Sequence, residues 1–188
     1  RQVSPGRAPE TSVELPQRLR ERDGPLLYLA LGSLGSADIG LMQRLVDLLA
    51  TSEHRIIVSK GPLADQISLH DNQVGERVLP QPAILPQVDL VITHGGNNTI
   101  CEAFHFGKPT IVLPLFWDQY DNAQRVDETG LGRRLDTYRV DRVGLVAAIA
   151  GLPGGAPLRA KLTGSRRPAP AHAGAARRLA QLGIASEV

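Results

Sequence analysis

Short, continuous apolar runs alternate along the chain with longer segments in which apolar residues recur every three to four positions. A continuous apolar run is typical of a strand with two buried faces. Apolar residues at the three-to-four spacing are typical of a helix with one buried face. These patterns predict strands at residues 26–32, 55–59, 76–79, 89–93, 110–113 and 133–135, and helices at residues 39–49, 97–107, 118–129, 141–150 and 170–182.

The alternation of strands and helices predicts an α/β fold, a Rossmann-like parallel sheet with helices on both faces. Open sheets of this kind bind ligands at the carboxyl ends of their strands. The loops that follow the predicted strands are therefore the places to look for chemistry. Residues 1–24 are rich in proline, glycine and charge and predict a flexible linker, whereas residues 25–188 predict the domain, with a tail at 154–188 that holds the last helix.

Composition narrows the class of protein. The chain has 188 residues, 42% hydrophobic and 21% charged, which at about 150 residues per domain predicts one soluble domain. No apolar run approaches the roughly 18 residues of a membrane-spanning helix, so none is expected. The net charge is +2, and the arginines of the tail lack interleaved aromatics, so no nucleic-acid partner is expected. The single cysteine fits a reducing, cytoplasmic location, and a first residue other than Met suggests a piece of a longer protein.

The loop after the first predicted strand reads Gly32-Ser33-Leu34-Gly35-Ser36. Its glycines let backbone amides approach an anion, and the following helix start adds partial positive charge. A plain tight turn explains the same residues equally well. The glycine spacing does not fit the dinucleotide fingerprint G-x-G-x-x-G, and Leu31 occupies the first glycine position of a G-x-S-x-G nucleophile turn.

A second loop, His94-Gly95-Gly96-Asn97-Asn98-Thr99, joins a predicted strand to a helix that carries Glu102. Free amides, amide and hydroxyl side chains and the helix dipole together predict an anion cradle, to which His94 can add a donor. Glu102 lies about one turn into the helix, where a carboxylate could accept from two ribose hydroxyls. The alternative is a well-capped turn in which His94 is only hydrogen-bonded structure.

A third loop ends in Asp118-Gln119 at the start of a predicted helix, a pair that can accept from and donate to sugar hydroxyls. The alternative is an N-cap aspartate with a solvated neighbour. His94 and His105 have neither the spacing nor the cysteine partners of a zinc site, so no metal is expected. Cys101 lies inside a predicted helix and is expected to be a small buried residue rather than a nucleophile.

Residues 78–135 resemble the donor-binding signature of the UDP-glycosyltransferase superfamily, most of all that of bacterial enzymes that glycosylate small natural products. The resemblance depends on many positions in order. The matching positions are Pro80-Gln81, His94-Gly95-Gly96, Asn98-Thr99, Glu102-Ala103, Gly107, Pro109, Pro114, Asp118-Gln119 and Asn122-Ala123. In plant members a tryptophan stacks on the base where this chain has Val78, which leaves uracil and thymine both open.

The resemblance implies the carboxyl-terminal half of a twin-Rossmann (GT-B type) hexosyltransferase that inverts configuration and uses no metal or other cofactor. It would move a hexose from a UDP- or dTDP-sugar to a hydroxyl of a small molecule. The implied donor contacts are Val78, Leu79 and Gln81 at the base and ribose, Glu102 at the ribose hydroxyls, Ser33, His94, Gly96, Asn98 and Thr99 at the diphosphate, and Asp118 and Gln119 at the sugar.

The catalytic base of the superfamily is a histidine of the amino-terminal, acceptor-binding domain, and no residue of this chain matches it. His94 would only stabilise the leaving diphosphate, so the chain alone is expected to be inactive. Two alternatives remain open at this point. One is a non-catalytic donor-binding subunit of a split transferase, and the other is a sugar-nucleotide epimerase domain.

Overall fold

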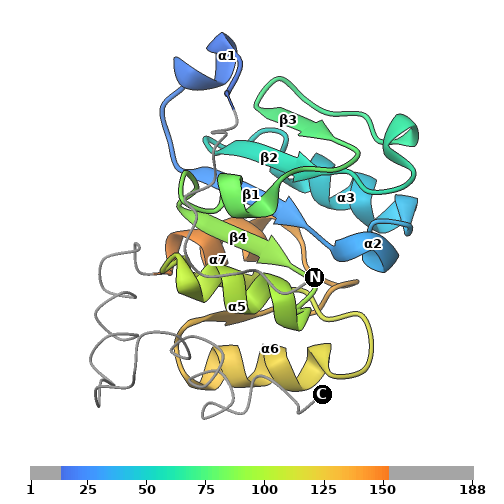
Figure 1. Ribbon diagram of the computed structural model, residues 1–188, viewed down its shortest axis with the longest axis vertical. Coiled ribbons are helices and arrows are strands. Elements are labelled where there is room, and N and C mark those ends of the chain that lie inside the picture. The colour runs from blue at the N-terminus through green and yellow to red at the C-terminus, as the bar shows by residue number, and fades with distance from the viewer. Residues whose placement is uncertain (1–13, 153–188) are drawn as a thin grey trace.

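The computed structural model describes residues 14–152. Its centre is a six-stranded sheet in the order β3-β2-β1-β4-β5-β6, with every neighbouring pair parallel (Figure 1). The order reverses between β1 and β4, which makes their carboxyl ends the topological switch point. The strands are β1 (Leu26–Ala30), β2 (Arg55–Ser59), β3 (Gln73–Glu76), β4 (Leu90–Thr93), β5 (Thr110–Val112) and β6 (Gly132–Arg134).

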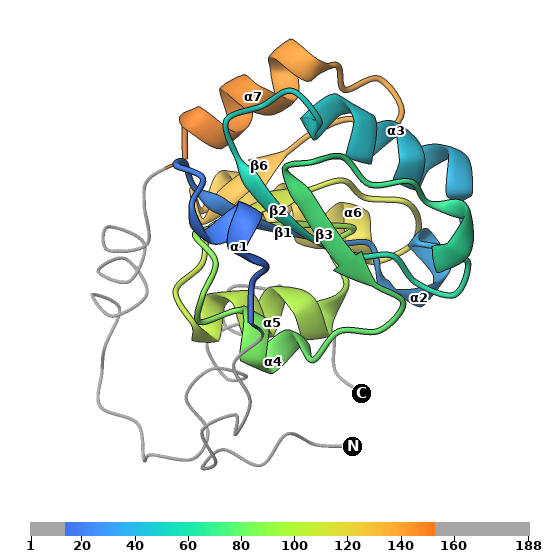
Figure 2. The same ribbon diagram turned by 90° about the horizontal axis from the view of Figure 1, so that it is seen from above.

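Helices cover both faces of the sheet (Figure 2). Alternate residues of β1 explain why: Leu27 and Leu29 pack with α3 and α7, whereas Leu26 and Tyr28 pack with α4 and α5 on the other face. α6 packs beside α5 over β5. The helices are α1 (Gln17–Arg20), α2 (Gly32–Gly35), α3 (Ile39–Leu49), α4 (Gln81–Ile84), α5 (Asn97–His105), α6 (Gln119–Glu128) and α7 (Arg142–Ala150), with a 3₁₀ turn η1 (Ala64–Gln66). The predicted α/β fold is confirmed.

The strand predicted at 76–79 is wrong, because the third strand is Gln73–Glu76. Its first residue is polar but fully buried: the Gln73 amide donates to the carbonyl of Val46 at 2.7 Å, and its oxygen accepts from the backbone N–H of His70. A buried glutamine with both ends satisfied carries no apolar signal. Residues 77–79 instead leave the sheet edge toward α4.

The described part of the predicted linker is packed on the domain. Leu19 of α1 is completely buried, and Arg18 donates to the carbonyl of Gln73 at 3.0 Å. Arg55 donates to the carbonyls of Gly24 and Leu19. The compact domain therefore begins before residue 25. The helix predicted at 170–182 and the rest of the tail lie outside the described residues.

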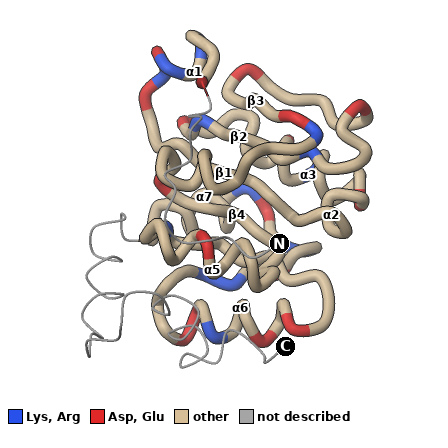
Figure 3. Tube along the Cα trace, viewed as in Figure 1, with Lys and Arg blue, Asp and Glu red and all other residues tan. Residues whose placement is uncertain are grey.

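Acidic and basic residues are interspersed on α6, where Arg125 lies among Asp121, Asp127 and Glu128 (Figure 3). Among residues 14–152, no helix is both long enough and apolar enough to cross a bilayer.

Candidate functional site

His94, the first residue after β4, lies between two glycine backbones at the switch point. A Cβ atom on Gly32 would lie 2.8 Å from His94 Cε1, and one on Gly96 would lie 2.6 Å from Nε2. Any side chain at either glycine would therefore displace the imidazole. Gly32 also has φ +66°, a backbone conformation that favours glycine. The loop after β1 and the turn after β4, predicted separately, are thus one site around one imidazole.

The environment of His94 controls its protonation. Burial lowers the pKa of the imidazole, and a hydrogen bond to the backbone carbonyl of Ala30 and the nearby carboxylate of Asp118 partly oppose this. The hydroxyl of Thr93 lies 3.3 Å from Nδ1. A neutral imidazole has one N–H and cannot donate both to Ala30 and to a ligand oxygen. An anion bound at the other nitrogen would favour the imidazolium, which donates from both.

The first turn of α5 adds backbone donors beside this imidazole. Gly96 is its N-cap and offers no side-chain cap, so the amides at the start of the helix lack an intrahelical or side-chain acceptor. Asn98 is exposed and Thr99 is buried. Orphan amides together with the helix dipole suit a phosphate group.

Three predicted residues meet on one side of this turn. Gln81 Nε2 donates to Glu102 Oε2 at 2.7 Å and lies 3.5 Å from Thr99 Oγ1. This pairing orients the Glu102 carboxylate and leaves its Oε1 as an acceptor. The arrangement suits a pair of neighbouring hydroxyls, as on a ribose.

The two residues predicted to meet the base differ in their surroundings. Val78 is 81% exposed, whereas Leu79 packs partly against the core beneath α4. The carbonyl of Leu79 accepts from the backbone N–H of Gln81 at 2.9 Å, so Leu79 and Gln81 form one turn at the start of α4.

On the opposite side of the turn, Asp118 occupies the N-cap of α6 but its side chain makes no cap hydrogen bond. The exposed carboxylate is therefore free to accept from a ligand. Gln119 is 4% exposed, and its Oε1 accepts from the backbone N–H groups of Leu115 and Phe116 at 2.9 and 3.3 Å. The alternative of a solvated neighbour is wrong, because Gln119 holds its own loop together and keeps only Nε2 for another partner.

Sequence reasoning missed two features of this loop. Trp117 has φ +53°, a left-handed conformation uncommon outside glycine, with its indole 79% exposed. Strain of this kind clusters at ligand-binding segments. Nothing in a pattern of apolar and polar residues signals a positive φ at a tryptophan.

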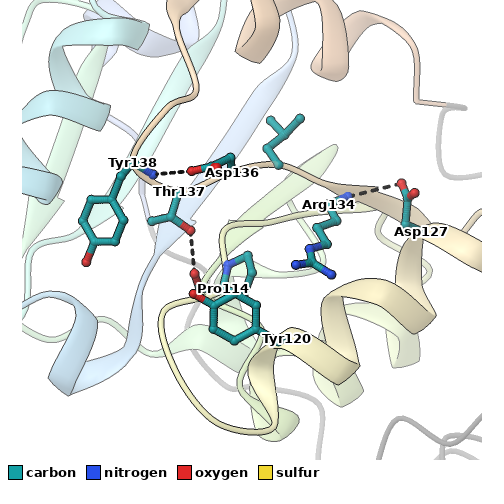
Figure 4. A pocket seen from close by; sticks show the side chains of 8 residues that line it. Pro114, Tyr120, Asp127, Arg134, Asp136, Thr137 and Tyr138 are labelled. Atoms are coloured by element: carbon teal, nitrogen blue, oxygen red, sulfur yellow. Dashed lines mark hydrogen bonds between the residues drawn. The ribbon is translucent and has the colours of Figure 1, made fainter.

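The second feature is a cavity of about 290 Å³ between this loop and the end of β6 (Figure 4). Thr137 Oγ1 donates to the carbonyl of Pro114 at 2.6 Å, and the Arg134 guanidinium lies 5.4 Å from the centre of the Tyr120 ring. The predicted donor residues do not line it. These contacts stabilise the loop on the side that faces the cavity.

Within residues 14–152, no group of three or more His, Cys, Asp and Glu side chains is placed to hold a metal ion. Cys101 was predicted to be a small buried residue, but it is only partly buried and packs against the core that α5 and α6 share. Its partial burial raises the pKa of the thiol.

The sheet order and the site at its switch point define a Rossmann-like domain. Residues 43–179 match the sequence model of a family described as "Erythromycin biosynthesis protein CIII-like, C-terminal domain", and the chain belongs to this family.

Curated relatives of the chain are glycosyltransferases. The NDP-glycosyltransferase YjiC of Bacillus subtilis (strain 168) is 34% identical over 130 residues, which are 68% of this chain and 33% of YjiC. A sterol 3-beta-glucosyltransferase of Yarrowia lipolytica (strain CLIB 122 / E 150) is 28% identical over 137 residues, which are 67% of this chain and 9% of that protein.

Solved structures that superpose on this chain are also glycosyltransferases. The glycotransferase of kitacinnamycin superposes with a TM-score of 0.74 at 27% identity, covering 95% of this chain and 46% of its own. The glycosyltransferase SnogD from Streptomyces nogalater superposes with a TM-score of 0.65 at 26% identity, covering 96% and 51%. The chain thus spans about a third of YjiC and about half of these structures. The chain is therefore a carboxyl-terminal domain of a glycosyltransferase family and has the fold of one Rossmann-like half of a GT-B type enzyme.

Proposed function

We propose that this chain is the donor-binding half of an inverting, metal-independent glycosyltransferase that moves a hexose from a UDP- or dTDP-sugar to a hydroxyl of a small molecule. One observation carries the proposal. The His94 turn is flanked on one side by the Gln81–Glu102 pair and on the other by the unpaired carboxylate of Asp118. The order along the site is therefore acceptors for ribose, donors for a diphosphate, and an acceptor for a sugar.

The diphosphate is the leaving group, and its negative charge grows as the anomeric C–O bond breaks. The amides at the start of α5 are fixed donors for that charge, and the imidazole of His94 adds a further donor when the bound anion favours its protonation. Ser33 and Asn98 present exposed side chains nearby. Donors that are already in place stabilise such charge without reorganisation. No metal ion is required for this step in the proposal.

The nucleoside end depends on Glu102 and Gln81. Glu102 Oε1 accepts from ribose hydroxyls, while the Gln81 amide holds the carboxylate in position. Val78 offers a small exposed surface to the base, which accommodates uracil and thymine alike.

The sugar end depends on the loop that follows β5. Asp118 accepts from sugar hydroxyls and Gln119 Nε2 donates to one, while Gln119 Oε1 keeps the loop in shape. We place the general base and the acceptor pocket in an amino-terminal domain, and the reaction in the cytoplasm. The base deprotonates the acceptor hydroxyl, which attacks from the face opposite the diphosphate and inverts the anomeric centre.

Titration calorimetry tests the donor half of this proposal. The 188-residue chain is titrated with UDP, dTDP, UDP-glucose and dTDP-glucose, with and without EDTA. We expect weak binding of the diphosphates that EDTA leaves unchanged. The chain joined to its amino-terminal domain is then expected to transfer sugar to a hydroxyl acceptor, whereas the chain alone transfers none. If none of the four nucleotides binds, the donor-binding role is refuted. If the chain alone transfers sugar, the assignment of the general base to an amino-terminal domain is refuted.

A further inference from the structure

A buried asparagine of α6 links the diphosphate turn to the loop that carries Asp118 and Gln119. Asn122 is 3% exposed, and its Nδ2 donates to the carbonyl of Gly95 at 3.0 Å and to Asn97 Oδ1 at 2.7 Å. Both hydrogens of the amide are used. The two acceptors lie on either side of Gly96, in the turn between β4 and α5.

The turn between β4 and α5 also packs closely against β5 and the start of α6. A Cβ atom on Gly95 would lie 2.7 Å from Val112 Cγ1 and 3.3 Å from the backbone oxygen of Gln119. Gly95 has φ +96°, so its carbonyl is held in an orientation that few other residues allow. The turn therefore rests against the first turn of α6, and the Asn122 amide fixes the register between them.

The second contact also fixes a side-chain amide. Asn97 Oδ1 accepts from Asn122, which leaves Asn97 Nδ2 as the free end of that amide. Asn97 is the first residue of α5, whose amides the proposed function assigns to the diphosphate.

We propose that Asn122 is a positioning residue for glycosyl transfer. Asn122 touches no substrate. It holds the donors for the diphosphate at a fixed distance from Asp118 and Gln119, so the leaving group and the sugar are bound in a fixed relative orientation. This inference rests on the proposed function. A misplacement of about 1 Å at a reacting centre can cost on the order of a hundredfold in rate.

The chain contains a matched control. Asn72 is 1% exposed, and its Nδ2 also donates to two carbonyls, those of Leu49 at 2.9 Å and His54 at 3.0 Å. These contacts lie at the amino ends of β2 and β3, away from the site. Asn72→Ala removes the same chemistry from an equally buried position.

The experiment compares ligands as well as variants. UDP affinity is measured by calorimetry and uridine affinity by NMR titration for the wild-type chain, Asn122→Ala and Asn72→Ala, with thermal unfolding of each. We expect Asn122→Ala to weaken UDP at least tenfold and uridine less than twofold, because uridine depends on Gln81 and Glu102. Asn72→Ala should lower the unfolding temperature comparably and leave both affinities within twofold.

Asn97→Ala probes the same link if Asn122→Ala does not fold, because it removes only the 2.7 Å acceptor from a partly buried position. It should weaken UDP more than uridine. Equal losses for UDP and uridine, or a UDP loss no larger than that of Asn72→Ala, would overturn the positioning role. A wild-type chain that binds neither UDP nor dTDP would refute the proposed function instead.

Discussion

Replacing Gly96 by alanine places a methyl carbon 2.6 Å from His94 Nε2. Ordinary contacts between such atoms begin near 3.5 Å, so the ring must move by about 1 Å. Gly96 has φ −64° and ψ 140°, which alanine adopts freely, so backbone strain adds nothing. Alanine is a poorer N-cap than glycine, so a part of the cost does not depend on His94. The part that does depend on His94 is the diagnostic one, and a double-mutant cycle isolates it.

Overpacking of this kind costs about 1–3 kcal/mol. At about 2–4 °C per kcal/mol for a chain of this size, we expect Gly96→Ala to lower the unfolding temperature by about 2–12 °C. In a His94→Ala background the clash is absent, so the same substitution should cost only the difference between alanine and glycine as N-cap, about 1 kcal/mol or less. Thermal unfolding of the four chains, measured without ligand, gives the coupling directly.

Gly40→Ala on α3 is the control, because its Cβ atom would meet only Asp38 Oδ1, at 3.6 Å. It should not lower the unfolding temperature. If Gly96→Ala unfolds like the wild-type chain, or loses the same stability with and without His94, then the imidazole does not lie between these glycines.

The site supports four further predictions. Glu102→Gln should weaken UDP by about 1.5–3 kcal/mol, since hydrogen bonds to a charged group are lost, and calorimetry with 2′,3′-dideoxy-UDP should show no such difference. Asp118→Asn, which breaks no hydrogen bond within the described chain, should leave the unfolding temperature and UDP affinity unchanged and weaken UDP-glucose. UDP-glucose affinity should rise by up to tenfold per unit as the pH falls from 8 toward the lowered pKa of His94, because the bound anion favours the imidazolium, and a flat profile would contradict this. Acid should destabilise the free chain in turn: burial keeps His94 and His54 neutral, so their contribution is present above pH about 6.5 and is lost as the pH falls through their lowered pKa values.

Much of the fold was predictable because its strands are buried on both faces. Continuous apolar runs such as residues 56–58 and 90–92 leave little choice but a central parallel strand. Gln73–Glu76 escaped prediction because the burial of Gln73 depends on partners far away in sequence. Single turns such as α2 and α4 are too short to show a helical period.

The site was predictable in its residue types but not in its contacts. Sequence position places His94 after a strand, yet only the packed structure shows Gly32 and Gly96 on either side of the ring. Asn122 matched the family signature, but its bonds to Gly95 and Asn97 depend on how α6 lies against the turn. Such contacts join segments about 25 residues apart and leave no local trace in the sequence.

The attachment of α1 has a mechanical consequence. Hydrogen bonds from Arg18 and Arg55 attach residues 17–24 to the sheet at β2 and β3. Leu19 is completely buried. Leu15 also packs against the core, so a cut at residue 25 would remove residues that this domain packs. Exchanges of domains between related enzymes should accordingly keep residues from Leu15 onward with this domain, so that α1 is not separated from the strands it packs on.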